Sequence, residues 1–599
     1  MDEKNVKPTA TEPEGLLGRR VDRRRILGGA AATAAAGIFV PGMFRQAAAA
    51  PAGRVSGPIT RDQALPADAA PAAKQVFVAP DNVTIAKVLD FSESVYERSS
   101  ASVFDLFSEP LVRMDKNFAI QPASAESWTG SADGKTWTFK IRAGMNWSDG
   151  NPVTAADWVA TFQYAADPKH AWDFTWFYQG VLKNWSEAIK GDVPLDQIGV
   201  RVGADPSELV IETEVPAPYL PTMMLYSNPL SKAGLTTTGP LYNTRPETSI
   251  SAGPFVLQEW RKDQQIVFAK NEKYTGAMKV AISKAIVKLA TPDTYFQMYQ
   301  NNEIDYMQDP PPAALTLMMN DAKTAKEVYS GVGDFPTWYI FFDVTKAPFD
   351  NLKVRQAWSH AIDRDTLKSK VLGPGGTPAY SWLAPGFPAS QREALQEIQA
   401  YNVEMGKKLL ADAGFPDGKD FPKQQLWLRA PTPLDKTVAG ALAAMLKQNL
   451  NIDVELLEKD AQGFTAALNA KPTQIPLGYV RYGMDYLDPS NMLSVWKSGG
   501  RHSWVNPDFD AKLKAASEFL GDPAERVKMF QEAEKILVAD VPGVFVYHGT
   551  PVQFLKPWLK GDFIKADANG ISSLHWPGFS AMCTVPEEMY IGSDAPDRG

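Results

Sequence analysis

Residues 128–164 constrain the fold of this chain most, because they read as a complete local unit of hairpin, turn and helix. Apolar and polar side chains alternate over residues 136–142, which is the pattern of a strand with one buried face. Asp133-Gly134 stands just before this strand, and both residue types tolerate the positive φ that the central residues of a type I′ turn need. The sequence therefore predicts a β-hairpin with a type I′ turn.

A predicted helix follows the hairpin, after a second turn at Asp149-Gly150. Thr154 stands three residues before Asp157, which is the spacing of a capping box in the first turn of a helix. The apolar residues that then share one helical face are Trp158, Phe162 and Ala165. The expected unit is therefore a hairpin, a turn and a capped helix.

Residues 133–158, with the sequence DGKTWTFKIRAGMNWSDGNPVTAADW, resemble the signature of the extracytoplasmic solute-binding proteins of ABC importers. The resemblance is to family 5, whose members bind peptides, nickel and some sugars. Further stretches resemble segments of this family in the same order: FDLFSEPLV at 104–112, PASAESW at 122–128, GPFVL at 253–257, NEKY at 271–274, NEID at 302–305, VRQAWSHAIDR at 354–364 and KKLLADAGF at 407–415. Together they extend over most of the chain after the predicted linker.

The resemblance implies an α/β protein with the two-lobed periplasmic-binding-protein fold. The variant implied is the type II-like, large peptide-binder form, with an extra subdomain in the first lobe and a hinge of two crossover strands. We expect residues 76–289 to form the first lobe, 290–544 the second, and 545–599 to return to the first. Apolar segments at 282–289 and 544–547 are the predicted crossings.

The first 49 residues resemble a secretory signal peptide. An arginine pair at 23–24, followed by one residue, an apolar residue and Leu27, resembles the twin-arginine type; a general secretory signal is the alternative. The apolar segment at 28–40 is too short to span a membrane. No cysteine lies near the cleavage site, so we expect release into the periplasm or outside the cell rather than a lipoprotein. Residues 50–75 are Ala- and Pro-rich, as a linker would be.

The chain after the signal is acidic. The whole sequence carries a formal charge of −8, but its first 49 residues hold 8 Lys or Arg and 5 Asp or Glu, which leaves 53 basic against 64 acidic residues and a charge of −11. Such a surface argues against a nucleic-acid partner. Cys583 is the only cysteine, which excludes an intramolecular disulfide and a cysteine-built metal site.

Sequence motifs for catalysis are missing. The chain contains no G-x-S-x-G, no H-E-x-x-H and no phosphate-cradling glycine loop. Its five histidines are far apart and show no ligand spacing: His170, His360, His502, His548 and His575. We therefore expect no catalytic residue, no metal and no cofactor, with a secreted hydrolase or a histidine-built nickel site as the alternative.

Asp485 is the first candidate for contact with a solute. Peptide-binding members of the family carry an aspartate just before a D-P or E-P pair, where the carboxylate holds the α-ammonium group of the peptide; Asp485 precedes Asp488-Pro489 in this way. A charge-assisted hydrogen bond in a water-poor site is stronger than one in water. The alternative is that Asp485 is a turn or cap residue of a segment rich in Gly, Asp and Pro.

Five further residues are weaker candidates for substrate binding. Tyr482 stands where the family commonly has Trp, and Arg481 could meet a substrate carboxylate. Trp382 and Trp496, and also Trp504, could stack on a sugar or a side chain, although core packing is the alternative for each. Core packing is also expected of the aromatic residues at 172–185.

The predicted ligand is a peptide, or in the alternative an oligosaccharide or another solute. The resemblance implies that a closed, loaded monomer delivers this ligand to the permease subunits of an ABC transporter and their ATPase.

Overall fold

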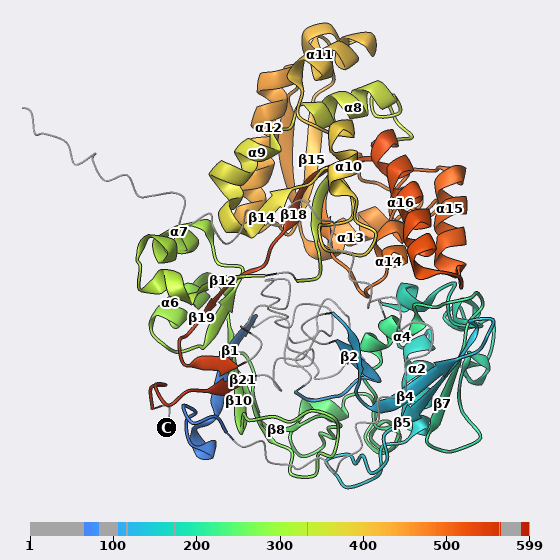
Figure 1. The fold of residues 1–599 in the computed structure, drawn as a ribbon, viewed down its shortest axis with the longest axis vertical. Coiled ribbons are helices and arrows are strands. Elements are labelled where there is room, and N and C mark those ends of the chain that lie inside the picture. The colour runs from blue at the N-terminus through green and yellow to red at the C-terminus, as the bar shows by residue number, and fades with distance from the viewer. Residues whose placement is uncertain are drawn as a thin grey trace, which may run out of the picture. The chain divides into compact units, whose positions relative to one another are not determined.

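A computed structural model describes residues 65–82, 106–114, 118–172, 174–331, 333–561, 564 and 589–597 (Figure 1). The predicted signal at 1–49 and most of the predicted linker lie outside the described residues. The strands of these described residues form three sheets of three or four strands, one six-stranded sheet and two short two-stranded ribbons. The ribbons pair β2 (Val112–Met114) with β3 (Ile120–Pro122) and β20 (Leu559–Gly561) with β21 (Met589–Ile591).

The first of these sheets, the base sheet, has the strand order β1-β10-β9-β8. Its strands are β1 (Val76–Asn82), β8 (Phe255–Arg261), β9 (Gln265–Lys270) and β10 (Lys284–Ala290). β10 pairs with β1 in parallel and with β9 antiparallel, so it is an inner strand of this sheet. The crossing predicted at 282–289 is therefore wrong, because that segment completes the base sheet rather than leaving it.

The predicted hairpin and capped helix form a second unit, the hairpin sheet, in the order β4-β5-β7-β6. Its strands are β4 (Ala125–Gly130), β5 (Thr136–Ile141), β6 (Val200–Val202) and β7 (Glu208–Glu212). Alternate residues of β5 are buried, namely Trp137, Phe139 and Ile141. Helix α2 (Ala155–Ala166) begins after Thr154, whose N–H donates to the Asp157 carboxylate at 2.9 Å, and it packs its apolar face into the same core. Short helices α3 (Trp185–Ala188), α4 (Leu220–Met223) and α5 (Lys232–Thr237) complete this part of the chain.

The hairpin turn differs from its prediction. β4 ends at Gly130 and β5 begins at Thr136, which leaves a five-residue loop at 131–135 rather than a two-residue turn. Only Gly134 of the Asp133-Gly134 pair has a positive φ, of 66°. The Asp133 carboxylate instead accepts hydrogen bonds from the Ser131 hydroxyl and the Lys135 N–H. Longer loops of this kind are commonly built around an ordinary type I turn, which needs no positive φ at the aspartate.

A third unit, the return sheet, joins distant parts of the chain in the order β11-β19-β12. Its strands are β11 (Tyr306–Gln308), β12 (Val328–Ser330) and β19 (Val552–Leu555), and helices α6 (Tyr295–Gln300) and α7 (Pro312–Asn320) lie between them in the sequence. Asp305 is fully buried and accepts from the Val78 N–H at 2.7 Å and from the Trp558 indole N–H at 2.6 Å. The aspartate of the NEID segment thus fastens the return sheet to the base sheet.

The six-stranded sheet has the order β14-β18-β13-β17-β15-β16. Its strands are β13 (Thr337–Phe342), β14 (Gly376–Pro378), β15 (Gln424–Arg429), β16 (Val454–Lys459), β17 (Leu477–Tyr482) and β18 (Gly543–Gly549). Its edge pair β15 and β16 is parallel, whereas β13 runs antiparallel to both of its neighbours. This mixed sheet with helices between its strands confirms the predicted α/β architecture.

Helices cover both faces of the six-stranded sheet (Figure 1). One face packs on α8 (Leu352–His360), α11 (Val403–Asp412) and α12 (Pro433–Leu450), and the other on α13 (Ala461–Asn469), α14 (Pro489–Ser494), α15 (Pro507–Glu518) and α16 (Pro523–Asp540). Two one-turn helices, α9 (Arg364–Leu367) and α10 (Arg392–Leu395), lie in the connections. As predicted, α11 ends before a glycine in the left-handed region, Gly414, with φ 99°.

Within the part of the chain that the structure describes, the chain passes between the return sheet and the six-stranded sheet twice, and the two passages lie side by side. The first runs from β12 to β13 and the second from β18 to β19. The Gly331 N–H donates to the Pro551 carbonyl at 3.2 Å, and the Gly549 N–H donates to the Pro336 carbonyl at 2.8 Å. The second passage therefore follows the segment predicted at 544–547, which is itself part of β18.

Residues 65–75 do not form a free linker. The Ala70 N–H donates to the Ile591 carbonyl at 2.8 Å. The fully buried Gln75 side chain donates to the carbonyls of Ala70 and Ile591 and accepts from the Ile591 N–H. The last part of the predicted linker is thus fixed to β21, because Gln75 saturates backbone groups of both segments.

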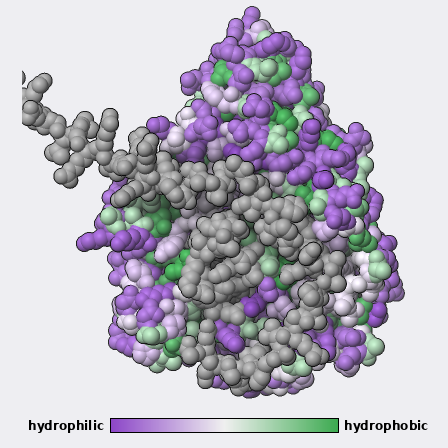
Figure 2. All heavy atoms as spheres, viewed as in Figure 1, coloured by the Kyte–Doolittle hydropathy of each residue, from purple (hydrophilic) through white to green (hydrophobic). Residues whose placement is uncertain are grey.

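On the face that Figure 2 shows, the described surface is mainly hydrophilic. Hydrophobic residues lie in separate spots on the face that Figure 2 shows. The large hydrophobic residues that are exposed are Trp176, Val202, Leu241, Leu317, Met319, Leu352, Tyr401, Met405, Val505 and Leu520. Among the helices that the structure describes, none has the length and apolarity needed to cross a bilayer.

Candidate functional site

The candidate site lies where β17 ends and α14 begins. Successive residues of a strand point to opposite faces of the sheet. Tyr482, the last residue of β17, therefore packs with the cluster that contains α14 and α16, whereas Tyr479 packs with the cluster that contains α8 and α12. The loop at 483–488 carries Asp485 and leads directly into α14, which begins after Asp488.

Asp485 is the centre of a small buried network. Its carboxylate oxygen Oδ2 accepts from the Tyr482 hydroxyl at 2.5 Å and from the Asn491 side-chain amide at 3.2 Å. The Asp485 N–H donates to the Asn491 side-chain oxygen at 2.8 Å, so one asparagine holds both the backbone and the side chain. Among the described residues, no hydrogen bond to Oδ1 is seen.

Burial changes the protonation of this carboxyl group. Asp485 is only 5% exposed, and desolvation raises its pKa to about 6. The hydrogen bonds from Tyr482 and Asn491 and the positive charge of Arg501 act against this shift, and the Asp334 carboxylate acts with it. Asp485 is therefore ionised at neutral pH and becomes protonated in mildly acidic solution.

Arg481 does not lie with Asp485. Its guanidinium carbon sits 5.3 Å from the centre of the Trp338 ring, on the face of β17 opposite to Tyr482. Desolvation acts to lower the pKa of Arg481, but the carboxylates of Asp334, Asp309 and Asp435 outweigh it and raise that pKa. Arg481 therefore lies beside Trp338 and Asp334 and not in the hydrogen-bond network of Asp485, and its contact with a substrate carboxylate stays a prediction.

Trp382 and Trp496 are core residues. Both are fully buried, and their rings meet edge to face with 5.5 Å between centroids. The Trp382 indole N–H donates to the Met492 carbonyl at 2.7 Å, and its ring stacks on Tyr482 at 6.3 Å. The structure therefore assigns both tryptophans to packing behind the candidate site, which was the alternative for each.

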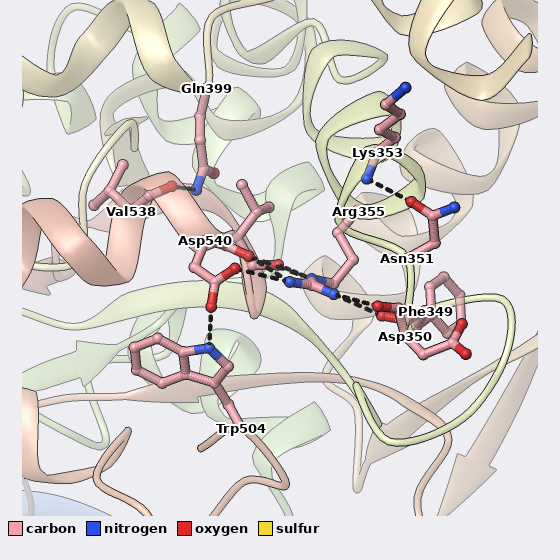
Figure 3. A network of polar contacts seen from close by, with 10 residues as sticks. Phe349, Asp350, Asn351, Lys353, Arg355, Gln399, Trp504, Val538 and Asp540 are labelled. Atoms are coloured by element: carbon pink, nitrogen blue, oxygen red, sulfur yellow. Dashed lines mark hydrogen bonds and ion pairs between the residues drawn. The ribbon is translucent and has the colours of Figure 1, made fainter. Parts of the chain in front are cut away.

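Trp504 has a structural role as well (Figure 3). Its indole N–H donates at 2.5 Å to one carboxylate oxygen of Asp540, and the other oxygen accepts from Arg355 at 3.0 Å. Arg355 also donates to the backbone carbonyls of Phe349 and Val541. This network joins the start of α8 to the end of α16, so neither Trp504 nor Arg355 is free to bind a solute.

The loop that carries Asp485 also contacts the region of the hairpin sheet. Tyr486 stacks on Tyr219 with 5.6 Å between centroids and 11° between planes, and it meets Phe177 edge to face at 5.8 Å. Two residues on, the Asp488 carboxylate receives two hydrogen bonds from Arg526 of α16, at 2.6 and 3.1 Å. The loop is therefore held rigidly on one side of the candidate site and packed against aromatic rings on the other.

Two residues of this site were missed in the sequence. Asn491 and Tyr486 carry no motif of their own, and Asn491 reads as an ordinary residue of α14. One signal could have identified Asn491. It lies in the first turn of a helix that directly follows the loop, and a side chain at such a position can reach back to the loop.

Comparison with known proteins connects this geometry to a family. The family model described as "Bacterial extracellular solute-binding proteins, family 5 Middle" matches residues 119–504. The chain is 30% identical to the periplasmic oligopeptide-binding protein OppA of Salmonella typhimurium, over 76% of this chain and 84% of that protein. It is also 30% identical to the probable deoxycholate-binding periplasmic protein YgiS of Escherichia coli, over 78% and 87%.

Solved structures show the same fold. The murein tripeptide binding protein MppA of Escherichia coli matches with a TM-score of 0.70 and 27% identity, over 88% of this chain and 99% of that one. Haemophilus influenzae OppA in complex with the peptide RPPGFSPFR matches with a TM-score of 0.68 and 25% identity, over 86% and 99%.

Proposed function

The chain belongs to the bacterial extracellular solute-binding proteins of family 5 and has their two-lobed α/β fold, and from this premise we propose that it captures peptides by their N-terminal ammonium group. The captured peptide is passed to the permease of an ABC transporter, whose ATPase drives import. The protein acts as a monomer and performs no catalytic step. OppA and MppA, two similar proteins, are peptide binders by their names.

The buried Asp485 carboxylate is the observation that supports a peptide ligand. An ionised carboxylate that is almost fully withdrawn from water is unfavourable unless a cation or several donors compensate it. Tyr482 and Asn491 both donate to Oδ2, which leaves Oδ1 for a ligand. An α-ammonium group carries the positive charge and the donors that this oxygen lacks, and a ligand without a cation would leave it unpaired.

The same charge argues against the other ligands of the family. Deoxycholate, which the relative YgiS is named for, carries a carboxylate that Asp485 would repel at neutral pH. The tryptophans that could have stacked on a sugar ring are buried in the core. A peptide is therefore favoured over an oligosaccharide or an anionic solute.

The two side-by-side passages support a hinge. We assign the described residues within 76–331 and 551–597 to the first lobe and residues 337–549 to the second, which moves the first boundary predicted at 290. Gly333 lies against Pro551, where an added Cβ would come within 2.6 Å of the proline ring. Two short adjacent connections can bend together, and a ligand that contacts both lobes shifts the population towards the closed form.

Export is part of this proposal. Residues 1–49 act as a twin-arginine-type signal, and the mature chain works in the periplasm or outside the cell without a lipid anchor. Conversion of the arginine pair at 23–24 to lysines is expected to hold the precursor in the cytoplasm, which fractionation and immunoblotting would measure. Normal export of this variant would leave the general secretory signal as the explanation.

The first experiment is a thermal-shift screen of the chain from residue 50 onward against di- to pentapeptides, their N-acetylated forms and oligosaccharides. A ligand that binds only the folded state raises the melting temperature by mass action. We expect shifts from peptides with a free amino group, reduced by N-acetylation and abolished in Asp485→Asn. Asp460→Asn is the matched control, because Asp460 is an exposed N-cap of α13 and Asn caps helices equally well. Shifts that survive N-acetylation would refute the ammonium site.

A further inference from the structure

We propose that Tyr482 and Asn491 are positioning residues for the ligand: they hold the Asp485 carboxylate so that its Oδ1 atom meets the ammonium group. This inference rests on the proposed function and deepens it. It gives a role to Tyr482, which stands where tryptophan is common in the family, and to Asn491, which the sequence did not single out.

The geometry of the three residues supports the proposal. The Tyr482 hydroxyl and the Asn491 amide both donate to Oδ2, and the amide nitrogen also lies 3.3 Å from the hydroxyl oxygen. The hydroxyl oxygen, the amide nitrogen and Oδ2 are thus each within hydrogen-bonding distance of the other two. Such an arrangement fixes the plane of the carboxylate, because rotation about χ2 would break two hydrogen bonds at once.

Each positioning residue is itself fixed by the fold. The Tyr482 ring stacks on Trp382, whose indole is anchored to the Met492 carbonyl in α14. Asn491 lies in the same helix and binds the backbone N–H of Asp485 through its side-chain oxygen. Strand, loop and helix are therefore connected through one carboxylate, and its position does not depend on the ligand.

The charges around the site come from two further segments. The guanidinium group of Arg501 lies over the Tyr482 ring at 5.0 Å, and its field lowers the pKa of Asp485. The Asp334 carboxylate, from the first passage, raises that pKa, and the Met484 N–H donates to the Asp334 carbonyl at 2.7 Å. The neighbouring Tyr486 is a neutral phenol whose own pKa lies well above its usual value because it is buried.

Tyr482 and Asn491 affect the Asp485 carboxylate through the hydrogen bonds that they donate to it. A phenol and an amide that donate to a carboxylate favour its ionised form, which is the form that binds an ammonium ion. A phenylalanine at position 482 keeps the ring and its stacking but removes the donor. Since one hydrogen bond to a charged group corresponds to about one pKa unit or more, the loss is large enough to measure.

The test compares Tyr482→Phe with wild type in two ways. The first is a carbon-13 NMR titration of the Asp485 carboxyl in the ligand-free protein, with the signal identified by its absence in Asp485→Asn. The second is the Kd of tetra-alanine and of N-acetyl-tetra-alanine between pH 5 and 8. We expect the titration midpoint to move up by about one pH unit, and tetra-alanine binding to weaken about twofold at pH 7 and nearly tenfold at pH 5.5.

Tyr479→Phe is the matched control, because it removes the same hydroxyl group from the same strand on the opposite face. It should change neither midpoint nor Kd. Asn491→Ala is the second variant and should weaken tetra-alanine binding at every pH, since it frees the loop backbone.

The outcomes separate the two hypotheses. Suppose that binding depends on the free amino group and on Asp485, but the titration midpoint of Asp485 does not shift in Tyr482→Phe. This result overturns the positioning role alone. A shifted midpoint with no preference for tetra-alanine over its N-acetyl form overturns the proposed function, and with it the ligand role of the pair.

Discussion

At the scale of single residues, the candidate site is controlled by one buried carboxylate. Asp485 lies in a loop, yet it has the burial of a core residue and two donors on one oxygen. Ordinary loop aspartates are solvated and serve turns or caps. The combination of burial, charge and fixed geometry makes Asp485 suited to recognise a cation.

We predict that peptide affinity depends on pH through Asp485. Its pKa in the free protein is raised to about 6, so the carboxylate is ionised above this pH and neutral below it. The Kd of a free-amino peptide should therefore increase about tenfold for each pH unit below about 5.5, and should be flat above about 7. Isothermal titration calorimetry from pH 4.5 to 8 would measure this; a profile in Asp485→Asn identical to that of wild type would contradict it.

The stability of the ligand-free protein should show the opposite trend. Because the folded pKa of Asp485 lies above its unfolded value, the folded state binds the proton more tightly. The Asp485 carboxyl group therefore adds to the free energy of unfolding at low pH, and this contribution is lost as the pH rises through about 6. Asp485→Asn should therefore raise the melting temperature of the ligand-free protein at pH 7.5 but not near pH 4. Scanning calorimetry at both values would measure this, and equal shifts at the two values would count against it.

A third prediction separates packing from binding. Replacement of Arg355 by Ala removes the partner of Asp540 and of two backbone carbonyls. Loss of one partner from such a buried network destabilises by about 3 kcal/mol or more. We expect a lower urea midpoint but an unchanged Kd for peptide, because the network lies outside the candidate site. An altered Kd for peptide in the fully folded variant would show that Arg355 contributes to binding, and would contradict this prediction.

At the scale of elements, the loop at 483–488 carries both the residue proposed to bind the ligand and a residue that contacts the other proposed lobe. Asp485 faces the proposed ligand position, and the next residue, Tyr486, stacks on Tyr219 of the proposed first lobe. Asp488 and Arg526 fix the end of this loop to α16. A ligand held by Asp485 would therefore lie beside the contact between the two proposed lobes.

Tyr486→Ala should therefore weaken ligand binding without changing the hydrogen bonds of the Asp485 carboxylate. Aromatic pairs contribute about 0.5–1.5 kcal/mol beyond their buried area, so the Kd should increase about two- to tenfold. The carboxyl midpoint of Asp485 should stay near its wild-type value in the same NMR titration. Met405→Ala, at an exposed residue of α11, is a control that removes apolar surface without removing a ring pair.

At the scale of the whole molecule, the fold is made by pairings between remote segments. β1 pairs with β10, β11 with β19, and residues 65–75 with β21. These pairings connect the start of the described chain to its end through the base and return sheets. Within the described residues the chain passes between the two proposed lobes twice, and such adjacent connections permit hinge motion.

Ligand-induced closure is the prediction at this scale. Small-angle scattering should show a smaller radius of gyration for wild type with tetra-alanine than without it. Asp485→Asn should show no change at the same peptide concentration, because a ligand shifts the equilibrium only by its differential affinity for the two states. Identical profiles for wild type with and without saturating peptide would contradict hinge closure.

The sequence by itself determined the local units and the family. The hairpin, the capped helix α2 and the glycine-ended helix α11 depend on residues that are neighbours in the chain, and periodicity and capping rules describe such interactions well. The ordered motifs identified the family, and the distance of Asp485 from Asp488-Pro489 selected the candidate carboxylate.

Only the tertiary structure decided which residues meet. It put Trp382 and Trp496 into the core, Arg481 on the opposite face of β17, and Asn491 beside Asp485. It also made 284–290 an inner strand of the base sheet rather than a crossing. Apolar periodicity shows that a side chain is buried, but the partner that buries it comes from distant segments whose pairing no local pattern encodes.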